Sequence, residues 1–200
     1  MVTGSEARLW ELIEARTHTD ADVDAIDARI WELFGEEWAV MFTDLVGFSR
    51  HAAKFGIIHF LQIIHEQHQL LLPIISDGSG FLVKSEGDSY IVLFRSVRRA
   101  IECAVAMQRA CQMASARRVD EEKILLCVGI GYGRILRVGE HEVWGTEVNA
   151  ASRLGEDTAR ADQILVTSGA REAAGTMDGI EFQAIDAVAA GSVSNFEVRY

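Results

Sequence analysis

Apolar residues recur at helical spacing at the start of the chain. Within residues 5–16 the leucines and the isoleucine share one face, and a second amphipathic stretch covers residues 22–34. Gly35 follows directly, at a position typical of a helix end. We predict that residues 1–36 form a helical N-terminal extension. We favour a packing or dimerising role for this extension, with transmission of a signal as the alternative.

From residue 38 onward the pattern changes to short apolar runs, turn residues and longer helical stretches. Strands are predicted at 38–43, 81–84, 89–94, 123–132, 164–167, 180–185 and 196–200, with a hairpin arm at 135–143. Helices are predicted at 48–75, which ends near Pro73 and the turn at 77–80, and at 97–117, 147–158 and 168–174. This β-α-β-β-α-β order predicts an α+β, ferredoxin-like domain over residues 37–200.

The net charge of the chain limits the classes of partner that it can bind. Hydrophobic residues make up 49% and charged residues 24%, and the formal net charge is −11. Ten acids against three bases give residues 1–37 seven of these eleven net negative charges. Such a balance argues against nonspecific binding to nucleic acid and against docking on an anionic membrane. It still allows a nucleotide site in which metal ions neutralise the phosphates.

Cysteine usage and hydropathy indicate the compartment. The chain has no Cys-x-x-Cys pair, and its odd set of cysteines favours a reduced, intracellular protein: Cys103, Cys111 and Cys127. The start of the chain lacks the features of a signal peptide, and no apolar run approaches the ~20 residues of a membrane span. We expect a cytoplasmic chain without a membrane segment of its own, which is compatible with a longer, membrane-attached parent protein.

Two aspartates lie at the edges of predicted strands. Asp44 follows the first strand, and Gly47 then permits a tight turn into a helix whose free N–H groups attract phosphate. Asp88 lies beside Gly87 at the tip of a predicted hairpin. Alone, each has an ordinary role as a helix N-cap or a turn residue. On adjacent central strands, the pair has the arrangement required by two divalent metals about 3.5–4 Å apart.

An amide and a guanidinium form a second polar pair. Asn149 and Arg153 are four residues apart, so they share one face of the predicted helix at 147–158. The ordinary interpretation of such a pair is a solvated polar face.

Three segments together resemble a known family. Residues 42–49 read Phe-Thr-Asp-Leu-Val-Gly-Phe-Ser, residues 84–89 read Lys-Ser-Glu-Gly-Asp-Ser, and residues 145–153 read Gly-Thr-Glu-Val-Asn-Ala-Ala-Ser-Arg. In this order they resemble the catalytic domain of class III nucleotidyl cyclases, the family of adenylyl and guanylyl cyclases. The resemblance covers roughly residues 38–200.

The resemblance implies a role for individual positions. Two divalent cations, Mg²⁺ or Mn²⁺, would be held by Asp44, Asp88 and the backbone carbonyl of Leu45. Asn149 would orient the ribose, and Arg153 would stabilise the charge that develops on the α-phosphate. The β- and γ-phosphates would lie against the backbone that follows the first aspartate, which we assign to Val46, Gly47, Phe48 and Ser49.

The choice of base depends on two further positions. Lys84 occupies the place where adenylyl cyclases carry lysine and guanylyl cyclases carry glutamate. Glu142 lies seven residues before the asparagine, where a carboxylate accepts from the adenine amino group. Their ordinary roles would be an exposed lysine at a strand end and a charge in a hairpin. By the resemblance both favour ATP over GTP.

The implied reaction converts ATP to 3′,5′-cyclic AMP and pyrophosphate, in intracellular second-messenger signalling. In the family, one subunit supplies the metal side of a site and its partner supplies the base side. This chain contains both sets, which implies a homodimer with two shared active sites. A regulatory domain or an activator would be a further partner.

One feature departs from the family pattern. The family supplies a phosphate-binding lysine late in the chain, whereas this chain has no lysine after Lys123. Either triphosphate binding is weaker, or an arginine substitutes, with Arg134, Arg137 and Arg199 as candidates. The missing lysine supports one alternative, a degenerate cyclase domain that binds nucleotide or a partner without turnover. A guanylyl cyclase is the other alternative, and Lys84 opposes it. A diguanylate cyclase would leave the asparagine–arginine pair unexplained.

Overall fold

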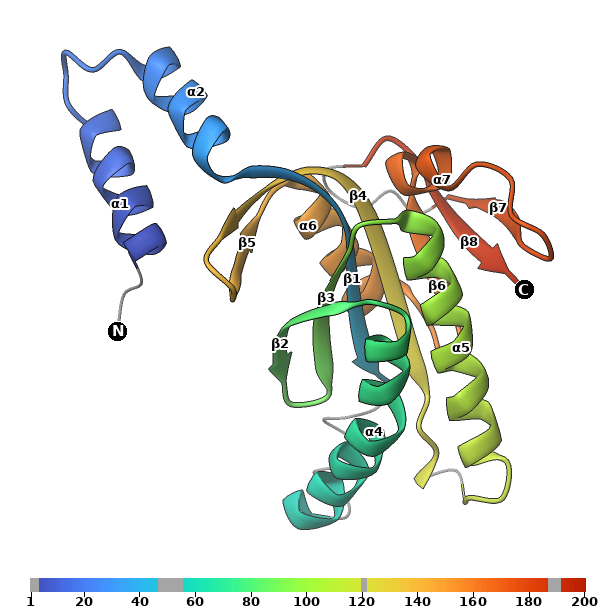
Figure 1. Cartoon of the computed structure of the whole chain (residues 1–200). Coiled ribbons are helices and arrows are strands. Elements are labelled where there is room, and N and C mark those ends of the chain that lie inside the picture. Colours follow the sequence, from blue (N-terminus) through green and yellow to red (C-terminus); the bar gives the residue numbers. More distant parts are fainter. Residues whose placement is uncertain (1–3, 47–55, 120–121, 187–191) are drawn as a thin grey trace.

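The computed structural model describes residues 4–46, 56–119, 122–186 and 192–200 (Figure 1). Its strands are β1 (Gly35–Leu45), β2 (Phe81–Glu86), β3 (Ser89–Phe94), β4 (Leu126–Val138), β5 (Glu142–Trp144), β6 (Ile164–Thr167), β7 (Glu181–Ile185) and β8 (Asn195–Arg199). Its helices are α1 (Gly4–Arg16), α2 (Val23–Phe34), α4 (Ile57–Asp77), α5 (Val97–Ser115), α6 (Thr146–Ser152), the π-helix η2 (Arg153–Thr158) and α7 (Ser168–Ala174).

One mixed sheet organises these elements. The strand order is β2-β3-β1-β4-β6-β8-β7, and β5 pairs with β4 outside this path. Strand β1 lies between β3 and β4 and is antiparallel to both, whereas β6 runs parallel to β4. The elements β1-α4-β2-β3-α5-β4 follow the βαββαβ order. The predicted α+β, ferredoxin-like class is confirmed.

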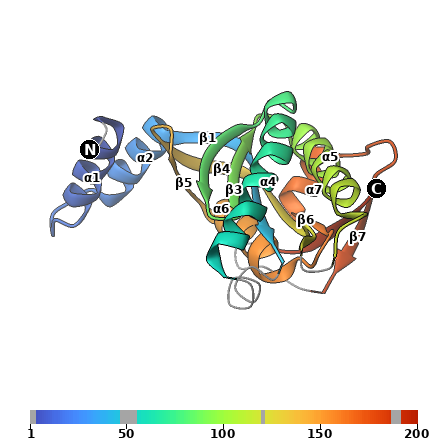
Figure 2. The ribbon, with the colours of Figure 1, turned by 90° about the horizontal axis from the view of Figure 1, so that it is seen from below.

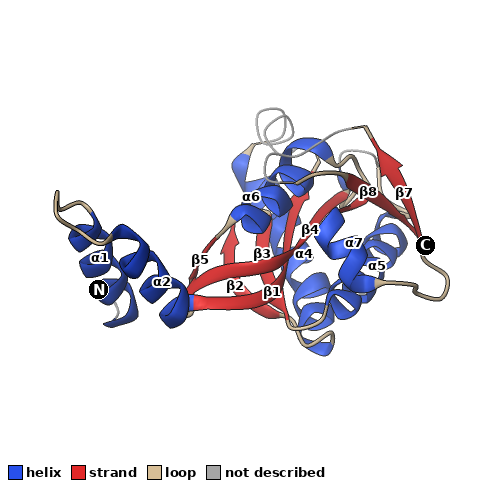
Figure 3. Cartoon of the chain, turned by 90° about the horizontal axis from the view of Figure 1, so that it is seen from above, coloured by secondary structure: helices blue, strands red, loops and turns tan. Residues whose placement is uncertain are grey.

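Helices cover both faces of the central strands. Helices α4 and α5 lie side by side on one face, and α6 lies on the other (Figures 2 and 3). Alternate residues of β1 serve the two sides: Ala39 and Met41 belong to the core under α4 and α5, and Val40 and Phe42 to the core under α6. Because both faces are covered, β1 is apolar along a continuous run instead of alternating with polar residues.

The N-terminal helices form a small pair at the far end of β4 (Figure 1). Their core combines residues of α1 and α2 with Val138 of β4. Asp22 caps α2 by accepting a hydrogen bond from the backbone nitrogen of Ala25 at 3.0 Å, and Arg16 joins Asp27 at 2.6 Å. Helix α2 ends where β1 begins, at Gly35. The division into an extension and a catalytic domain at residues 36 and 37 remains a prediction.

The central strands are longer than predicted. Strand β1 runs from Gly35 to Leu45 instead of 38–43, so it includes Asp44 and two glutamates at its start. Strand β4 continues through the region where a strand end at 132 and a separate hairpin arm were predicted. The cause is non-local: the first residues of β1 pair with Arg134, Ile135 and Leu136 and extend the ladder.

The long helix α4 also differs from its prediction. It begins within the described residues at Ile57 and contains Pro73 in its interior, ending only at Asp77. Proline removes one backbone hydrogen bond from a helix. Here Leu71 and Ile75 are buried on either side of Pro73, and this packing keeps the helix continuous to Gly78.

Candidate active site

The structure brings Asp44 and Asp88 to the same end of the sheet. Asp44 is the second-to-last residue of β1, and Asp88 lies in the turn between β2 and β3. The β1–β3 register pairs Thr43 with Tyr90, which places Asp44 beside Ser89. The Ser89 hydroxyl donates to Oδ1 of Asp44 at 3.3 Å. The turn aspartate thereby faces the aspartate at the strand end.

Burial disfavours the charged form of both carboxyl groups, and the charge of Asp44 adds to this effect at Asp88. Asp88 is only 7% exposed; burial, together with the charge of Asp44, raises its pKa to about 6. Burial also raises the pKa of Asp44, which the neighbouring Leu45 amide and Ser89 hydroxyl partly oppose. Oδ2 of Asp88 is buried and has no hydrogen-bond partner among the described residues. A buried, unpartnered oxygen next to a second carboxylate fits a divalent cation.

The described residues place two carboxylates, those of Asp44 and Asp88, at this end of the sheet. Among the described residues, no group of three or more histidine, cysteine, aspartate or glutamate side chains is arranged to hold a metal. Backbone, water or substrate oxygens are further ligands that Mg²⁺ commonly takes beside carboxylates. Leu45, whose carbonyl is the predicted third ligand, ends β1 and pairs with Leu126 of β4.

Two residues that the sequence interpretation missed hold this carboxylate turn. The Thr43 hydroxyl accepts a hydrogen bond from the backbone nitrogen of Tyr90 at 3.1 Å. Nε2 of Gln67, on α4, donates to the backbone oxygen of Asp88 at 2.8 Å. A signal for Gln67 was present in the sequence, because it is a polar residue within the apolar face of a helix. Its partner, 21 residues away, was not predictable from that pattern.

The predicted phosphate-binding backbone is only partly described. The Val46 nitrogen donates to the Leu125 oxygen at 2.9 Å, so this N–H is already used within the protein. The other three positions, Gly47, Phe48 and Ser49, lie outside the described residues.

Asn149 and Arg153 lie on consecutive helical segments. Asn149 belongs to α6 and is exposed, whereas Arg153 begins the π-helix η2 and pairs with Asp157 at 2.5 Å. The helix predicted at 147–158 therefore changes from α to π winding at Arg153. Single π-helical turns within α-helices are frequent at functional sites. Within the described part of the chain, no side-chain hydrogen bond or ion pair joins Asn149 or Arg153 to the two aspartates.

Glycines allow α6 and η2 to lie directly on the sheet. A Cβ at Gly129 of β4 would overlap the Ala151 oxygen and the Gly155 nitrogen. Glu147 fixes the start of α6, because its Oε2 accepts from the Tyr132 nitrogen at 3.0 Å and the Thr167 hydroxyl at 2.7 Å. This close packing sets the position of Asn149 and Arg153 relative to β1.

Lys84 and Glu142, the predicted base-reading residues, lie near each other. Nδ1 of His141 lies 3.3 Å from the Val83 oxygen, which places the turn before β5 against β2. The Lys84 ammonium pairs with Glu86 at 2.7 Å. Glu86, with a smaller effect of Glu142, raises the pKa of Lys84. The exposed amine and the half-buried carboxylate therefore belong to one polar region.

The three arginines proposed as substitutes for a late lysine have different surroundings. Arg134 donates to the Trp31 oxygen at 3.0 Å and stacks on its ring, which ties it to the end of α2. Arg137 lies over the Trp38 ring, with its Nε buried and unpaired among the described residues. Arg199 pairs with Glu197 at 2.9 Å. The segment 187–191, where the lysine would be expected, lies outside the described residues.

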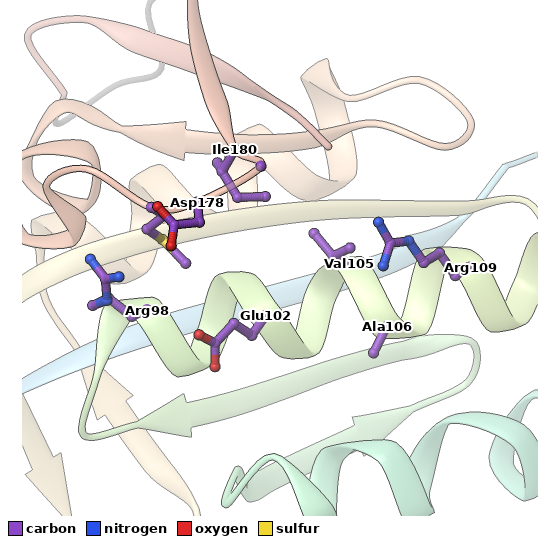
Figure 4. A pocket seen from close by; sticks show the side chains of 9 residues that line it. Arg98, Glu102, Val105, Ala106, Arg109, Asp178 and Ile180 are labelled. Carbon is purple, nitrogen blue, oxygen red and sulfur yellow. The ribbon is translucent and has the colours of Figure 1, made fainter.

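A cavity elsewhere in the molecule contains none of the predicted site residues. It has a volume of about 460 Å³ and lies between α5 and the segment before β7. Arg98 and Asp178 lie near one end of it and Arg109 near the other (Figure 4). Arg98 donates to the Ala174 and Thr176 oxygens, so it connects α5 to the end of α7.

Among the described residues, no helix has both the length and the apolar character needed to cross a membrane.

Comparisons with known proteins identify the relatives of the chain. A profile of the adenylate and guanylate cyclase catalytic domain matches residues 35–192. The chain is 29% identical over 134 residues to putative adenylate cyclase 3 of Rhizobium meliloti (strain 1021), covering 67% of this chain and 22% of that protein. It is 32% identical over 149 residues to an adenylate cyclase of Streptomyces coelicolor (strain ATCC BAA-471 / A3(2) / M145), covering 74% and 37%. The chain thus spans well under half the length of these relatives.

A solved structure supports the fold. The adenylyl cyclase CyaB from P. aeruginosa superposes with a TM-score of 0.69 at 20% identity, over 83% of this chain and 95% of that one. At this identity the likeness concerns the fold alone.

The contact at Gly129 leads to a test of how α6 is held. Gly129→Ala should lower the free energy of unfolding by about 2 kcal/mol, because the new methyl group overlaps backbone atoms that cannot move aside easily. Chemical denaturation measures this loss. The control is Gly4→Ala, where a Cβ meets nothing within 4 Å. Equal stability of the two variants would contradict the close packing of α6 on β4.

The repulsion between the aspartates gives a second test, in metal-free protein. Asp88→Asn should raise the free energy of unfolding by about 2 kcal/mol above pH 7, because it removes a buried charge beside Asp44. Since the folded-state pKa of Asp88 is raised, protonation stabilises the wild type as the pH falls through about 6. The advantage of the variant should therefore shrink towards pH 4.

Denaturation at several pH values, with EDTA present, checks this prediction. Asp20→Asn, at an exposed position between α1 and α2, is the control and should show little change. Added Mn²⁺ should stabilise the wild type more than Asp88→Asn. A variant that is less stable than the wild type at every pH would refute the repulsion.

Proposed function

The chain belongs to the family of adenylate and guanylate cyclase catalytic domains, and on that basis we propose that it converts ATP to 3′,5′-cyclic AMP and pyrophosphate. The observation that carries the proposal is the pairing of the buried Asp88 carboxylate with Asp44 at the end of the central strand. The adenylate cyclases among its relatives support the choice of ATP.

Asp44, Asp88 and the Leu45 carbonyl would hold two divalent cations, Mg²⁺ or Mn²⁺, which when bound would activate the ribose 3′-hydroxyl and neutralise the phosphates. The fit rests on the unpartnered Oδ2 of Asp88 and on the raised pKa of both carboxyl groups. The backbone of Gly47, Phe48 and Ser49 would face the β- and γ-phosphates, whereas the N–H of Val46, also predicted for this role, is engaged by the Leu125 oxygen.

Asn149 and Arg153 would act on the other side of the substrate. The Asn149 amide would hold the ribose in place, and the Arg153 guanidinium would stabilise the charge that develops on the α-phosphate. For this, Arg153 would have to leave Asp157, with which it forms an exposed ion pair worth little.

We propose a two-fold homodimer in which each active site is shared. Its support is that, among the described residues, no side-chain hydrogen bond or ion pair joins the asparagine–arginine pair to the two aspartates of the same chain. A partner subunit would supply the missing half of each site, and the two-fold symmetry would create two equivalent sites.

Lys84 and Glu142 would select adenine. Lys84 would donate to adenine N1, which is an acceptor, whereas N1 of guanine carries a proton and would oppose it. Glu142 would accept from the adenine amino group. The electrostatic proximity of the two side chains supports a shared role. A guanylyl cyclase is the alternative, and a receptor-type guanylate cyclase of Caenorhabditis elegans, 22% identical over 129 residues, is among the relatives.

A cyclase domain that binds nucleotide or a partner without turnover is the second alternative. The chain has no lysine after Lys123, and Arg134, one candidate to replace it, is engaged with α2. Against this alternative stands the retained pair of aspartates. We place the enzyme in the cytoplasm, in second-messenger signalling, with a regulatory domain or activator as its further partner.

A direct assay tests the proposed activity. Purified protein is incubated with ATP or GTP and Mg²⁺ or Mn²⁺, and the cyclic nucleotide is quantified. We expect cyclic AMP from the wild type and at least about a hundredfold less from Asp44→Ala, because a metal ligand is lost. No product from either nucleotide, in a well-folded dimer, would favour the binding module. Cyclic GMP as the main product would favour the guanylyl cyclase.

The base assignment has its own test. Lys84→Glu should lower kcat/KM for ATP at least about tenfold, because an acceptor then faces adenine N1. The control is Arg99→Glu, which makes the same change of charge at an exposed position of α5. Steady-state kinetics with ATP and GTP distinguish the two variants. Equal effects of both variants on ATP and GTP would remove Lys84 from the base site.

A further inference from the structure

The buried face of α4 contains one polar residue. Its buried positions are Phe60, Ile63, Gln67, Leu71 and Ile75, at the spacing of a single helical stripe. Gln67 is fully buried, with 0% exposure, in the middle of this stripe. An apolar residue at this position would bury its surface at no polar cost, whereas a buried amide loses its hydration. The glutamine therefore needs a compensating interaction.

That interaction is with the turn that carries Asp88. Nε2 of Gln67 donates to the backbone oxygen of Asp88 at 2.8 Å. Glu86 and Ser89 form the last pair of the β2–β3 ladder, so Gly87 and Asp88 are the two turn residues and lack ladder partners. The Gln67 amide supplies a partner for the Asp88 carbonyl and so fixes the peptide plane that follows this residue.

Within the described part of the chain, only the nitrogen of the Gln67 amide has a hydrogen-bond partner. Oε1 of Gln67 is buried and has no hydrogen-bond partner among the described residues. An unpaired buried acceptor lowers the stability of the fold, and an apolar residue would fill this part of the core with a smaller loss of stability. The interaction that Gln67 does make is directed at the backbone of one of the two paired aspartates.

We propose that Gln67 is a positioning residue for the metal-binding carboxylate of Asp88, an inference that rests on the function proposed above. By holding the Asp88 carbonyl, Gln67 fixes the backbone from which the carboxylate projects towards Asp44. Loss of a group that orients a metal ligand weakens metal binding without removing the ligand itself. Through this bond the position of α4 also becomes coupled to the carboxylate pair.

The test replaces Gln67 by methionine, which has a similar shape but lacks the amide. The metal-free full-length chain is titrated with Mn²⁺ alone, and free Mn²⁺ is measured by electron paramagnetic resonance. We expect the dissociation constant for Mn²⁺ to rise about tenfold in Gln67→Met. The Mg²⁺ concentration at half-maximal activity should rise in parallel.

The chain offers a matched control on α5. Gln108 is also fully buried, donates through Nε2 to the Leu126 oxygen at 2.9 Å, and has an unpaired Oε1 among the described residues. Its other acceptor is the Gln163 oxygen, before β6, so it serves the opposite side of β4 from β1. Gln108→Met should change stability to a similar extent as Gln67→Met but leave Mn²⁺ affinity within about twofold of the wild type.

Each outcome supports or contradicts the positioning role of Gln67 or the metal-binding role of Asp88. Weaker Mn²⁺ binding in Gln67→Met alone supports the positioning role. Unchanged Mn²⁺ binding in Gln67→Met, or an equal loss in Gln108→Met, would overturn it while leaving the proposed function intact. A wild type that binds no more Mn²⁺ than Asp88→Asn would overturn the metal assignment, and this inference with it. If Gln67→Met does not fold, Gln67→Asn, whose amide is too short to reach, replaces it.

Discussion

The strand register between β1 and β3 is the constraint on which the rest of the site depends. Because Thr43 pairs with Tyr90, Asp44 comes to lie beside Ser89 and next to the turn that carries Asp88. A shift by one residue would turn the Asp44 side chain to the opposite face of the sheet. The register is well determined, since β1 is buried on both faces and pairs on both edges. A polar site is thus specified by the packing of an apolar strand.

A second constraint is the close approach of α6 and η2 to β4. The glycines of β4 remove the side chains that would hold a helix away, and Glu147 bonds to β4 and Thr167 at the same place. Asn149 and Arg153 therefore sit on a helix with little freedom to shift. The two polar pairs lie on different parts of the chain, one at the β1 and β2–β3 turn and the other on α6 and η2. In the proposed homodimer, a complete site would form where these two parts, contributed by different subunits, meet.

The sequence predicted those parts of the structure that depend on local pattern. The family was recognised from three short segments, and the profile match confirms it. Strand β6 and helix α7 were placed to the residue, since their apolar runs and flanking residues mark both ends. The π-helix at Arg153 was missed, because a change from α to π winding leaves the apolar periodicity of a short helix almost unaltered. The length of β4 was missed because it depends on pairing with residues about 100 positions earlier in the chain.

The N-terminal helices show why one question could not be answered from sequence. Helix α2 continues into β1 without a linker, and Arg134 of β4 holds the Trp31 carbonyl at its last turn. The opposite end of the same strand β1 carries Asp44. These contacts would let the helices pack on the domain. Through the same contacts, a displacement of the helices would reach the central strands. A packing role and a signal-transmitting role share one set of interactions, so the amphipathic pattern of residues 1–36 is the same for both.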